Sequence, residues 1–158
     1  MSEDAVCDPE KGELCILGKR HIAVDVQTFC SFLDSLVGVK VGEVIMHNIE
    51  FSLGKMDAAR LRAERPQSSL TELVEHLTNA DRLSGTGITK VTLPENPQNR
   101  ILIEVANPGV KGTAGAAKEF LVAWWAGAFS ALYDKEFDVK HVAYDEGKKL
   151  LTGAIAAR

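Results

Sequence analysis

The stretch KEFLVAWWAGAF, residues 118–129, decides the fold, because it contains both tryptophans and every residue after Glu119 is apolar or glycine. The apolar run from Phe120 to Leu132 is about 13 residues long, shorter than the roughly 20 needed to cross a bilayer. A helix that is apolar on all sides is expected to be buried on more than one side. We therefore predict a central core helix rather than a membrane span.

The two tryptophans of this helix fall on different faces, because adjacent residues on a helix diverge by about 100°. Trp124 shares its face with Phe120 and Gly127, while Trp125 shares the neighbouring face with Phe129. Packing in the core alone is one sufficient interpretation. The other is that at least one tryptophan lines a cavity or a subunit interface, where large amphipathic rings are favoured.

The first half of the chain indicates a short strand followed by helices. Residues 1–14 are interpreted as a mobile acidic lead, and residues 15–158 as one domain. Alternation in residues 19–25 favours a strand, and helical spacing follows in residues 26–38 and 40–64. Asp25 is positioned as the cap of the first helix.

A third helix is predicted over residues 68–80, where Ser69 and Glu72 form a capping-box signature. On the long helix before it, an apolar stripe contains Val41, Val44, Ile45, Ile49, Leu53 and Met56. Gly54 lies inside this pattern, and a glycine within a helix costs about 1 kcal/mol against alanine. It can instead mark the close approach of another helix or of a ligand.

The second half of the chain changes to the two-residue alternation of strands. Residues 88–93 and 100–107 predict a hairpin closed by PENPQN, and residues 135–145 and 150–157 predict two further strands. The expected order is β-α-α-α-β-β-α-β-β. This is an α/β (α+β) domain with an antiparallel sheet of about four strands packed on helices.

Composition narrows the classes of partner. The formal net charge of −4 and a pI of about 5.6 lack the basic footprint typical of nucleic-acid binding. The N-terminus has no apolar segment typical of a secretory signal, so a cytoplasmic location is expected. Cys7, Cys15 and Cys30 are an odd number without a CxxC pair, and reduced thiols are the plain interpretation.

Four further stretches carry a family resemblance: LSGTGITKV (83–91), ILIEVANPG (101–109), FLVAWWAGAFSAL (120–132) and KEFDVKHVAYDEG (135–147). Together with residues 16–36 and 51–58, they make residues 15–157 similar to the 4-vinyl reductase or hydrocarbon-binding domain family. The resemblance implies an α/β fold related to vesicle-tethering transport-particle subunits, and often a dimer. It also implies binding of small apolar or aromatic molecules or tetrapyrroles.

The chain departs from that family at its metal-binding cysteines. The resemblance places the family's Cys-His of the central helix at Lys118 and Glu119, and its later cysteines near Glu146 and Thr152. Lysine cannot replace a thiolate as a soft metal ligand at neutral pH. No metal is therefore expected, and any cofactor is left open.

Other candidate chemistry is weaker. Glu43, His47 and Glu50 lie at i, i+4 and i+7, a spacing that suits a divalent metal or acid–base chemistry but equally a solvated helix edge. The sequence GVKGTAG before the central helix lacks a phosphate-loop motif. No nucleophile elbow or catalytic triad spacing is present, which favours a protein that is not an enzyme.

These observations favour a homodimeric module that binds a small apolar, aromatic or tetrapyrrole-like ligand as a sensor, carrier or accessory factor. Its pocket is expected between the tryptophan helix and the helix of residues 40–64. The residues expected to bind the ligand are Met46, His47, Phe51, Met56, Phe120, Trp124 and Trp125, and Lys118 is a further polar candidate. A dimeric scaffold without a ligand and an accessory subunit of pigment or cofactor biosynthesis are the alternatives.

Overall fold

The computed structural model describes residues 5–8, 13–16, 19–21, 24–94, 100–111 and 115–158. Within the first 21 residues, three short strands form an antiparallel sheet in the order β1-β2-β3. They are β1 (Ala5–Asp8), β2 (Glu13–Ile16) and β3 (Lys19–His21). The sequence predicts neither β1 nor β2. Of the strand expected over residues 19–25, Lys19–His21 form β3 and residues 24–25 are not strand, while residues 22–23 lie outside the described residues.

The remaining elements form a larger α+β unit. They are α1 (Val26–Val37), α2 (Val39–Glu64), α3 (Leu70–Ser84), β4 (Ile88–Thr92), β5 (Ile101–Ala106), α4 (Gly115–Glu119), α5 (Val122–Tyr133), β6 (Phe137–Asp145) and β7 (Leu150–Ala157). The second sheet is fully antiparallel with strand order β4-β5-β7-β6. This order of elements confirms the predicted α+β arrangement. Most of the predicted PENPQN loop lies outside the described residues.

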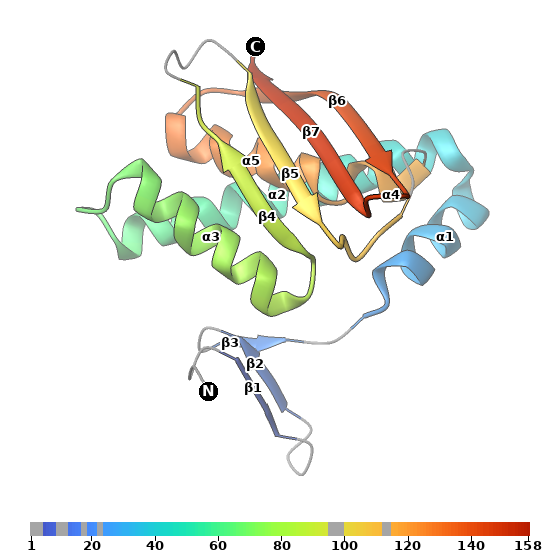
Figure 1. Ribbon diagram of the computed structural model, residues 1–158, viewed down its shortest axis with the longest axis horizontal. Coiled ribbons are helices and arrows are strands. Elements are labelled where there is room, and N and C mark those ends of the chain that lie inside the picture. Colours follow the sequence, from blue (N-terminus) through green and yellow to red (C-terminus); the bar gives the residue numbers. More distant parts are fainter. Residues whose placement is uncertain (1–4, 9–12, 17–18, 22–23, 95–99, 112–114) are drawn as a thin grey trace.

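The unit is layered, with α5 lying between the sheet and α2 (Figure 1). Helix α3 packs beside β4 at one edge of the sheet, and α1 lies against α2 and α4. The central position of α5 explains its sequence. Every residue of α5 from Val122 to Leu132 is buried except Trp124 and Ala131. The prediction that this helix is buried on more than one side is therefore confirmed.

Local capping begins the helices where the sequence indicates. The Asp25 side chain accepts a hydrogen bond of 2.7 Å from the backbone N–H of Thr28. At α3, the Ser69 hydroxyl accepts from the Glu72 N–H, and the Glu72 carboxylate accepts from the Ser69 N–H, which completes the predicted capping box.

The tryptophan helix differs from its prediction in one respect, because it is broken. Helix α4 ends at Glu119, the chain turns at Phe120 and Leu121, and α5 begins at Val122. The start of α4 is fixed by a side chain from α1, since both Asp34 oxygens accept from the Ala116 N–H at 2.9 and 3.2 Å. From α2, the Glu43 carboxylate accepts from the Gly115 N–H at 3.2 Å.

The apolar stripe predicted on α2 does not mark its buried side. Val41, Val44 and Met56 of that stripe are 50%, 61% and 67% exposed. The buried line instead runs through Gly42, Met46, Glu50, Gly54, Ala58 and Leu61. The glycines in this line mark close neighbours, since Gly42 lies against Asp34 of α1 and Gly54 lies against the backbone of α5.

Two glycines make this approach possible. A Cβ atom built on Gly54 would overlap the carbonyl oxygen of Trp124, and one built on Gly127 would overlap the carbonyl oxygen of Phe51. The backbones of α2 and α5 therefore touch at their crossing. Of the two interpretations that the sequence left open for Gly54, the close approach of another helix is confirmed.

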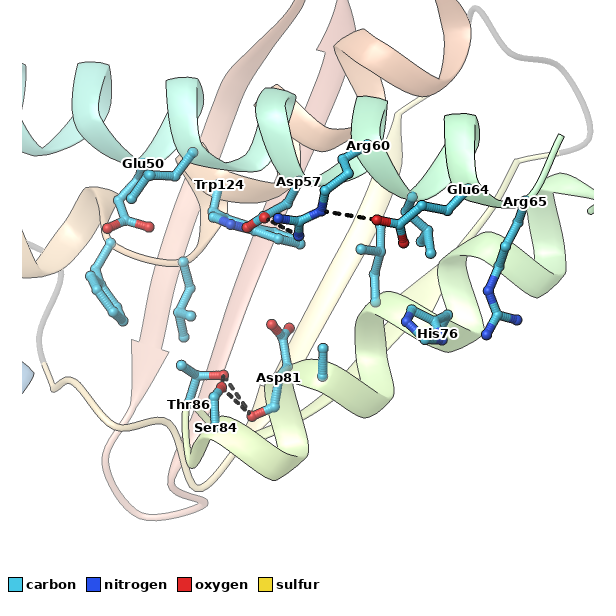
Figure 2. Close-up of a pocket in the computed structure, with 16 residues that line it drawn as sticks. Glu50, Asp57, Arg60, Glu64, Arg65, His76, Asp81, Ser84, Thr86 and Trp124 are labelled. Carbon is cyan, nitrogen blue, oxygen red and sulfur yellow. Dashed lines mark hydrogen bonds and ion pairs between the residues drawn. The ribbon is translucent and has the colours of Figure 1, made fainter. Parts of the chain in front are cut away.

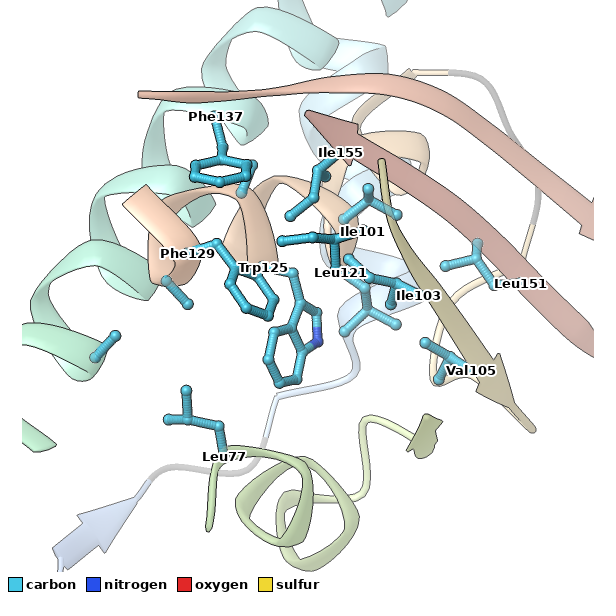
Figure 3. Packing of buried hydrophobic residues seen from close by; sticks show 14 of the residues in the cluster. Leu77, Ile101, Ile103, Val105, Leu121, Trp125, Phe129, Phe137, Leu151 and Ile155 are labelled. Carbon is cyan, nitrogen blue, oxygen red and sulfur yellow. The ribbon is translucent and has the colours of Figure 1, made fainter. Parts of the chain in front are cut away.

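On its other side, α5 packs against the sheet through large apolar residues (Figure 3). Trp125 and Phe129 are fully buried, with ring centroids 5.7 Å apart, and Phe137 of β6 extends the aromatic cluster. The inward side chains of the sheet complete the core: Ile101, Ile103, Val105, Leu151 and Ile155.

Among the described residues, no helix combines the length and the apolar character that a membrane crossing needs.

The glycine crossing predicts an unusual response to substitution. Replacing glycine by alanine inside a helix normally stabilises it by about 1 kcal/mol, but Gly54→Ala should destabilise this protein by about 2 kcal/mol or more through overpacking. Urea unfolding followed by circular dichroism measures this change. Gly147→Ala is the control, because its Cβ would meet only the Asp145 carboxylate at an ordinary 3.4 Å. A Gly54→Ala protein as stable as this control would contradict the backbone contact.

Candidate functional site

A cavity of about 770 Å³ lies between α2 and α3. Its third wall is the turn after α4 together with the first residues of α5. The volume lies within the range of about 300–1,000 Å³ that is typical of small-molecule sites. We call it the α2–α3 cavity, and Figure 2 shows the side chains that line it.

Helical spacing explains how the chain builds this cavity. From α2 and its end come Glu50, Leu53, Asp57, Arg60, Leu61, Glu64 and Arg65, and from α3 and the turn after it come His76, Leu77, Ala80, Asp81, Ser84 and Thr86. Each set recurs every three or four residues and so occupies one helix face. Phe120, Leu121 and Trp124 close the third side. The cavity is therefore lined by a mixture of side chains. Apolar and aromatic side chains come from all three walls, and the charged side chains come from α2 and α3.

Glu50 is the most unusual group in the wall. It is only 8% exposed, and it makes no hydrogen bond or ion pair with any residue in the described ranges. None of the buried polar side-chain atoms in those ranges lacks a partner. The Glu50 carboxyl oxygens must therefore border open space, and that space is the cavity. Burial, and secondarily the charges of Asp57 and Asp81, raise its pKa to about 8.

Asp81 points into the cavity from α3, opposite α2 (Figure 2). Its Oδ2 atom accepts hydrogen bonds from the Thr89 hydroxyl at 2.8 Å and from the Trp125 indole N–H at 3.2 Å. Burial raises the pKa of Asp81 to about 6, although these two bonds oppose the shift. Asp81 thus connects the cavity to the aromatic core.

Arg60 pairs with two acidic side chains of α2 in the same wall. The Arg60 guanidinium donates to Asp57 at 2.8 Å, and it lies 3.6 Å from Glu64 (Figure 2). These side chains are substantially exposed, so the network lies toward solvent and is worth little stability. It leaves Glu50 and Asp81 as the buried carboxyls of the cavity.

The residues predicted to bind a ligand are spread over three surroundings. Phe120 and Trp124 line the α2–α3 cavity. Met46 and Trp125 are buried in the core, with 1% and 0% exposure, and Phe51 packs half-buried against that core. Met56 is 67% exposed.

His47 lines a smaller cleft of about 200 Å³, together with Glu43, Val44, Asn48 and Glu119. Its Nδ1 atom lies 2.9 Å from a carboxylate oxygen of Glu119, a residue that is only 7% exposed. Lys118 bridges Glu43 and Glu119 at 3.7 and 3.5 Å. The two positions where the family resemblance places Cys-His therefore form ion pairs that join α4 to α2.

The predicted set of Glu43, His47 and Glu50 is divided between the two hollows, since Glu50 faces the larger one. Among the described residues, no group of three or more His, Cys, Asp or Glu side chains is arranged to hold a metal ion.

Sequence reasoning missed α3 as a wall of the pocket. Its cavity-facing residues include Leu77 and Asp81, and neither is among the residues that the sequence predicts to bind a ligand. A usable signal was present on α2, where Glu50, Leu53 and Asp57 recur at i, i+3 and i+7. A carboxylate in line with buried positions is typical of a functional polar group.

The raised pKa of Glu50 makes stability depend on pH. A carboxyl whose pKa is higher in the folded state favours folding below its unfolded value of 4.5, and this contribution is lost as pH rises toward 8. Glu50→Gln removes the penalty, so its free energy of unfolding should increasingly exceed that of the parent protein between pH 5 and 8. Thermal unfolding at several pH values measures the difference.

Glu75→Gln is the matched control, because Glu75 is an exposed residue of α3 outside the cavity. Its stability should follow the parent protein at every pH. If the free energy of unfolding of Glu50→Gln changes with pH in the same way as that of the parent protein, burial does not raise the pKa of Glu50 in the folded state.

No family model matches the sequence, and no curated protein matches it. Solved structures do match. The phenol-responsive sensory domain of the transcription activator PoxR, in a crystal structure with phenol, superposes with a TM-score of 0.73 at 14% identity, over 99% of this chain and 86% of that one.

A vinyl-4-reductase family protein from Methanocaldococcus jannaschii superposes with a TM-score of 0.54 at 17% identity, over 87% of this chain and 84% of that one. At these identities the likeness establishes the fold alone. The resemblance to the 4-vinyl reductase family that the sequence indicated is confirmed at that level: this chain has the fold of a vinyl-4-reductase family protein and of a phenol-responsive sensory domain.

Proposed function

We propose that this protein is a small-molecule-binding module whose ligand occupies the α2–α3 cavity. The observation that carries the proposal is the preformed cavity of about 770 Å³ with an apolar and aromatic inner end and two buried carboxyls. Small-molecule sites typically combine such an apolar lining with a few placed polar groups. The ligand is therefore a compact molecule with an aromatic or other apolar body.

The fold neighbours support the same class of function. One of them is described as phenol-responsive and was crystallised with phenol. A role as a sensor or carrier follows from this proposal more readily than catalysis, because the cavity wall contains no serine or cysteine next to a basic partner of the kind that activates a nucleophile.

The proposal includes a homodimer, formed through the helices on the outer side of the molecule. Large apolar side chains are exposed along α1 and α2: Phe29, Phe32, Leu36, Val39, Val41, Val44, Ile49, Leu53 and Met56. On α1, Phe29, Phe32 and Leu36 lie at i, i+3 and i+7 and so share one face. Extended apolar surfaces of this kind are typical of interaction sites, and a second copy of the chain is the simplest partner.

Filling the cavity should abolish ligand binding without unfolding the protein. Ala80 is a partly exposed residue of α3 that lines the cavity. In Ala80→Trp the added indole occupies the space of the ligand, so the affinity for phenol or toluene should fall by about tenfold or more. Isothermal titration calorimetry measures this affinity, and circular dichroism checks the fold.

Ala59→Trp is the matched control, since Ala59 is exposed on α2 and does not line the cavity. It should bind as the parent protein does. Parent protein that binds no aromatic compound of this size, and that carries no retained small molecule in native mass spectra, would refute the proposed function.

Charges on the outer helices should prevent dimerisation. In Phe32→Glu combined with Val44→Glu, two carboxylates would have to be desolvated at the interface, which is far more costly than leaving them in water. Sedimentation equilibrium should give a dimer mass for the parent protein and a monomer mass for the double variant. A parent protein that remains a monomer at high concentration would contradict the dimer.

A further inference from the structure

The charges around the α2–α3 cavity do not balance at its inner end. The acidic groups that face it are Glu50, Asp57 and Glu64 of α2 and Asp81 of α3. The basic groups are Arg60 and Arg65, with His76 as a neutral or cationic third. Asp57 and Glu64 are the partners of Arg60, so this cation is already engaged at the outer part of the wall.

Glu50 and Asp81 lack such a partner. Each is 8% exposed, and no ion pair joins either of them to a cation anywhere in the described part of the chain. The two hydrogen bonds of Asp81 come from neutral donors and reach only Oδ2, so Oδ1 is left without a bond among the described residues. Two buried carboxyls on facing helices thus present acceptor oxygens to the same hollow.

Keeping a carboxyl largely withdrawn from water costs stability, because burial disfavours its charged form. Burial raises the pKa of Glu50 and of Asp81 although their free oxygens border the hollow. The cost is understandable if a bound molecule supplies the missing partner. The missing partner is a positive group that donates hydrogen bonds, because carboxylates accept them and the cavity already has an excess of negative charge.

The surroundings of Glu50 specify the rest of that molecule. The rings of Phe120 and Trp124 and the side chain of Leu121 line the same hollow. An aromatic face attracts a cation that lies over it, and it also packs against an apolar body. The same wall therefore serves both ends of an amphipathic cation.

We propose that the ligand of the α2–α3 cavity is an aromatic or alkyl amine in its protonated form, whose ammonium group is held by Glu50, with Asp81 as a second acidic group of the same wall, and whose apolar body packs on Phe120 and Trp124. This inference rests on the proposed function, since it names the class of ligand for the same cavity. It differs from binding of a neutral phenol, which needs only one hydrogen-bond acceptor and gains nothing from two acidic groups.

A protonated amine should also make binding depend on pH through Glu50. The groups that face or influence Glu50 are Asp57, Asp81, Arg60 and, on α1, the buried thiol of Cys30, whose own pKa is raised to about 11 and which therefore stays neutral. Since the pKa of Glu50 is about 8 in the empty cavity, an ammonium group would displace a proton from it at neutral pH. The affinity should then rise from pH 6 to pH 8.

The test compares three probes of one shape: benzylamine, benzyl alcohol and benzoate. Titration calorimetry of the full chain at pH 7.5 should show that benzylamine binds about tenfold or more tightly than benzyl alcohol, and that benzoate binds most weakly. In two buffers of different ionisation enthalpy, benzylamine should release protons, whereas benzyl alcohol should release none.

Glu50→Gln separates charge from shape, because glutamine keeps the size of the side chain. This variant should lose about tenfold or more of its affinity for benzylamine, while its affinity for benzyl alcohol changes less than about threefold. Glu75→Gln removes the same charge outside the cavity and should change neither affinity. Circular dichroism of each variant establishes that it is folded.

The outcomes distinguish the two proposals. If benzyl alcohol binds as tightly as benzylamine, or if Glu50→Gln binds benzylamine as well as the parent protein does, the amine inference is overturned and the proposed function stands. If none of the probes binds and no small molecule is retained, both are overturned.

Discussion

The contact between the backbones of α2 and α5 at Gly54 and Gly127 is the constraint on which the rest of the structure depends. Two helices normally pack with their axes 8–10 Å apart, separated by side chains. Here each glycine lies against a carbonyl of the other helix, so no side chain separates them at the crossing. Helix α5 can therefore lie in the middle of the molecule and still bury its opposite face against the sheet.

The cavity follows from the same arrangement. Because α5 holds α2 firmly at the crossing, α2 continues beyond it toward Glu64 without a second helix beneath it on that side, and α3 closes the space only partly (Figure 1). A loosely packed space between two helices is normally filled by large apolar side chains. At this place apolar side chains such as Leu61, Leu77 and Trp124 leave a hollow, and the carboxyls of Glu50 and Asp81 share its wall, which is the composition of a site rather than of a core.

Several elements could be predicted from the sequence because their signals are local. The Ser69–Glu72 capping box, the Asp25 cap and the alternation of residues 101–106 depend on neighbours within a few positions, and each forms as expected. The burial of α5 on both sides also follows from its own composition. Trp124 and Phe120 at the cavity fit this pattern, because they occupy the face that the periodicity separates from Trp125.

The features that the sequence does not predict depend on how elements far apart in the sequence approach one another. The stripe that includes Val41 and Met56 has the spacing of a buried face, yet the buried line of α2 is the one that contains Gly54, whose position the approach of α5 requires to be small. The break at Phe120 and Leu121 interrupts a segment whose composition favours an unbroken helix. The role of Asp81 depends on Thr89 and Trp125, which come from two other elements of the chain.

The hydrogen bond from the Trp125 indole to Asp81 has an optical consequence. Indole emission shifts with the electric field along the ring, and the hydrogen-bond partner of this ring is a carboxyl at the wall of the cavity. Trp124, with its ring edge-on to Trp125 at 5.2 Å, stands in the cavity wall itself. These are the only two tryptophans in the sequence. A ligand in the cavity would therefore change the surroundings of the protein's tryptophan fluorophores. Occupancy of the cavity can thus be followed in the unlabelled protein by the wavelength and intensity of its tryptophan fluorescence.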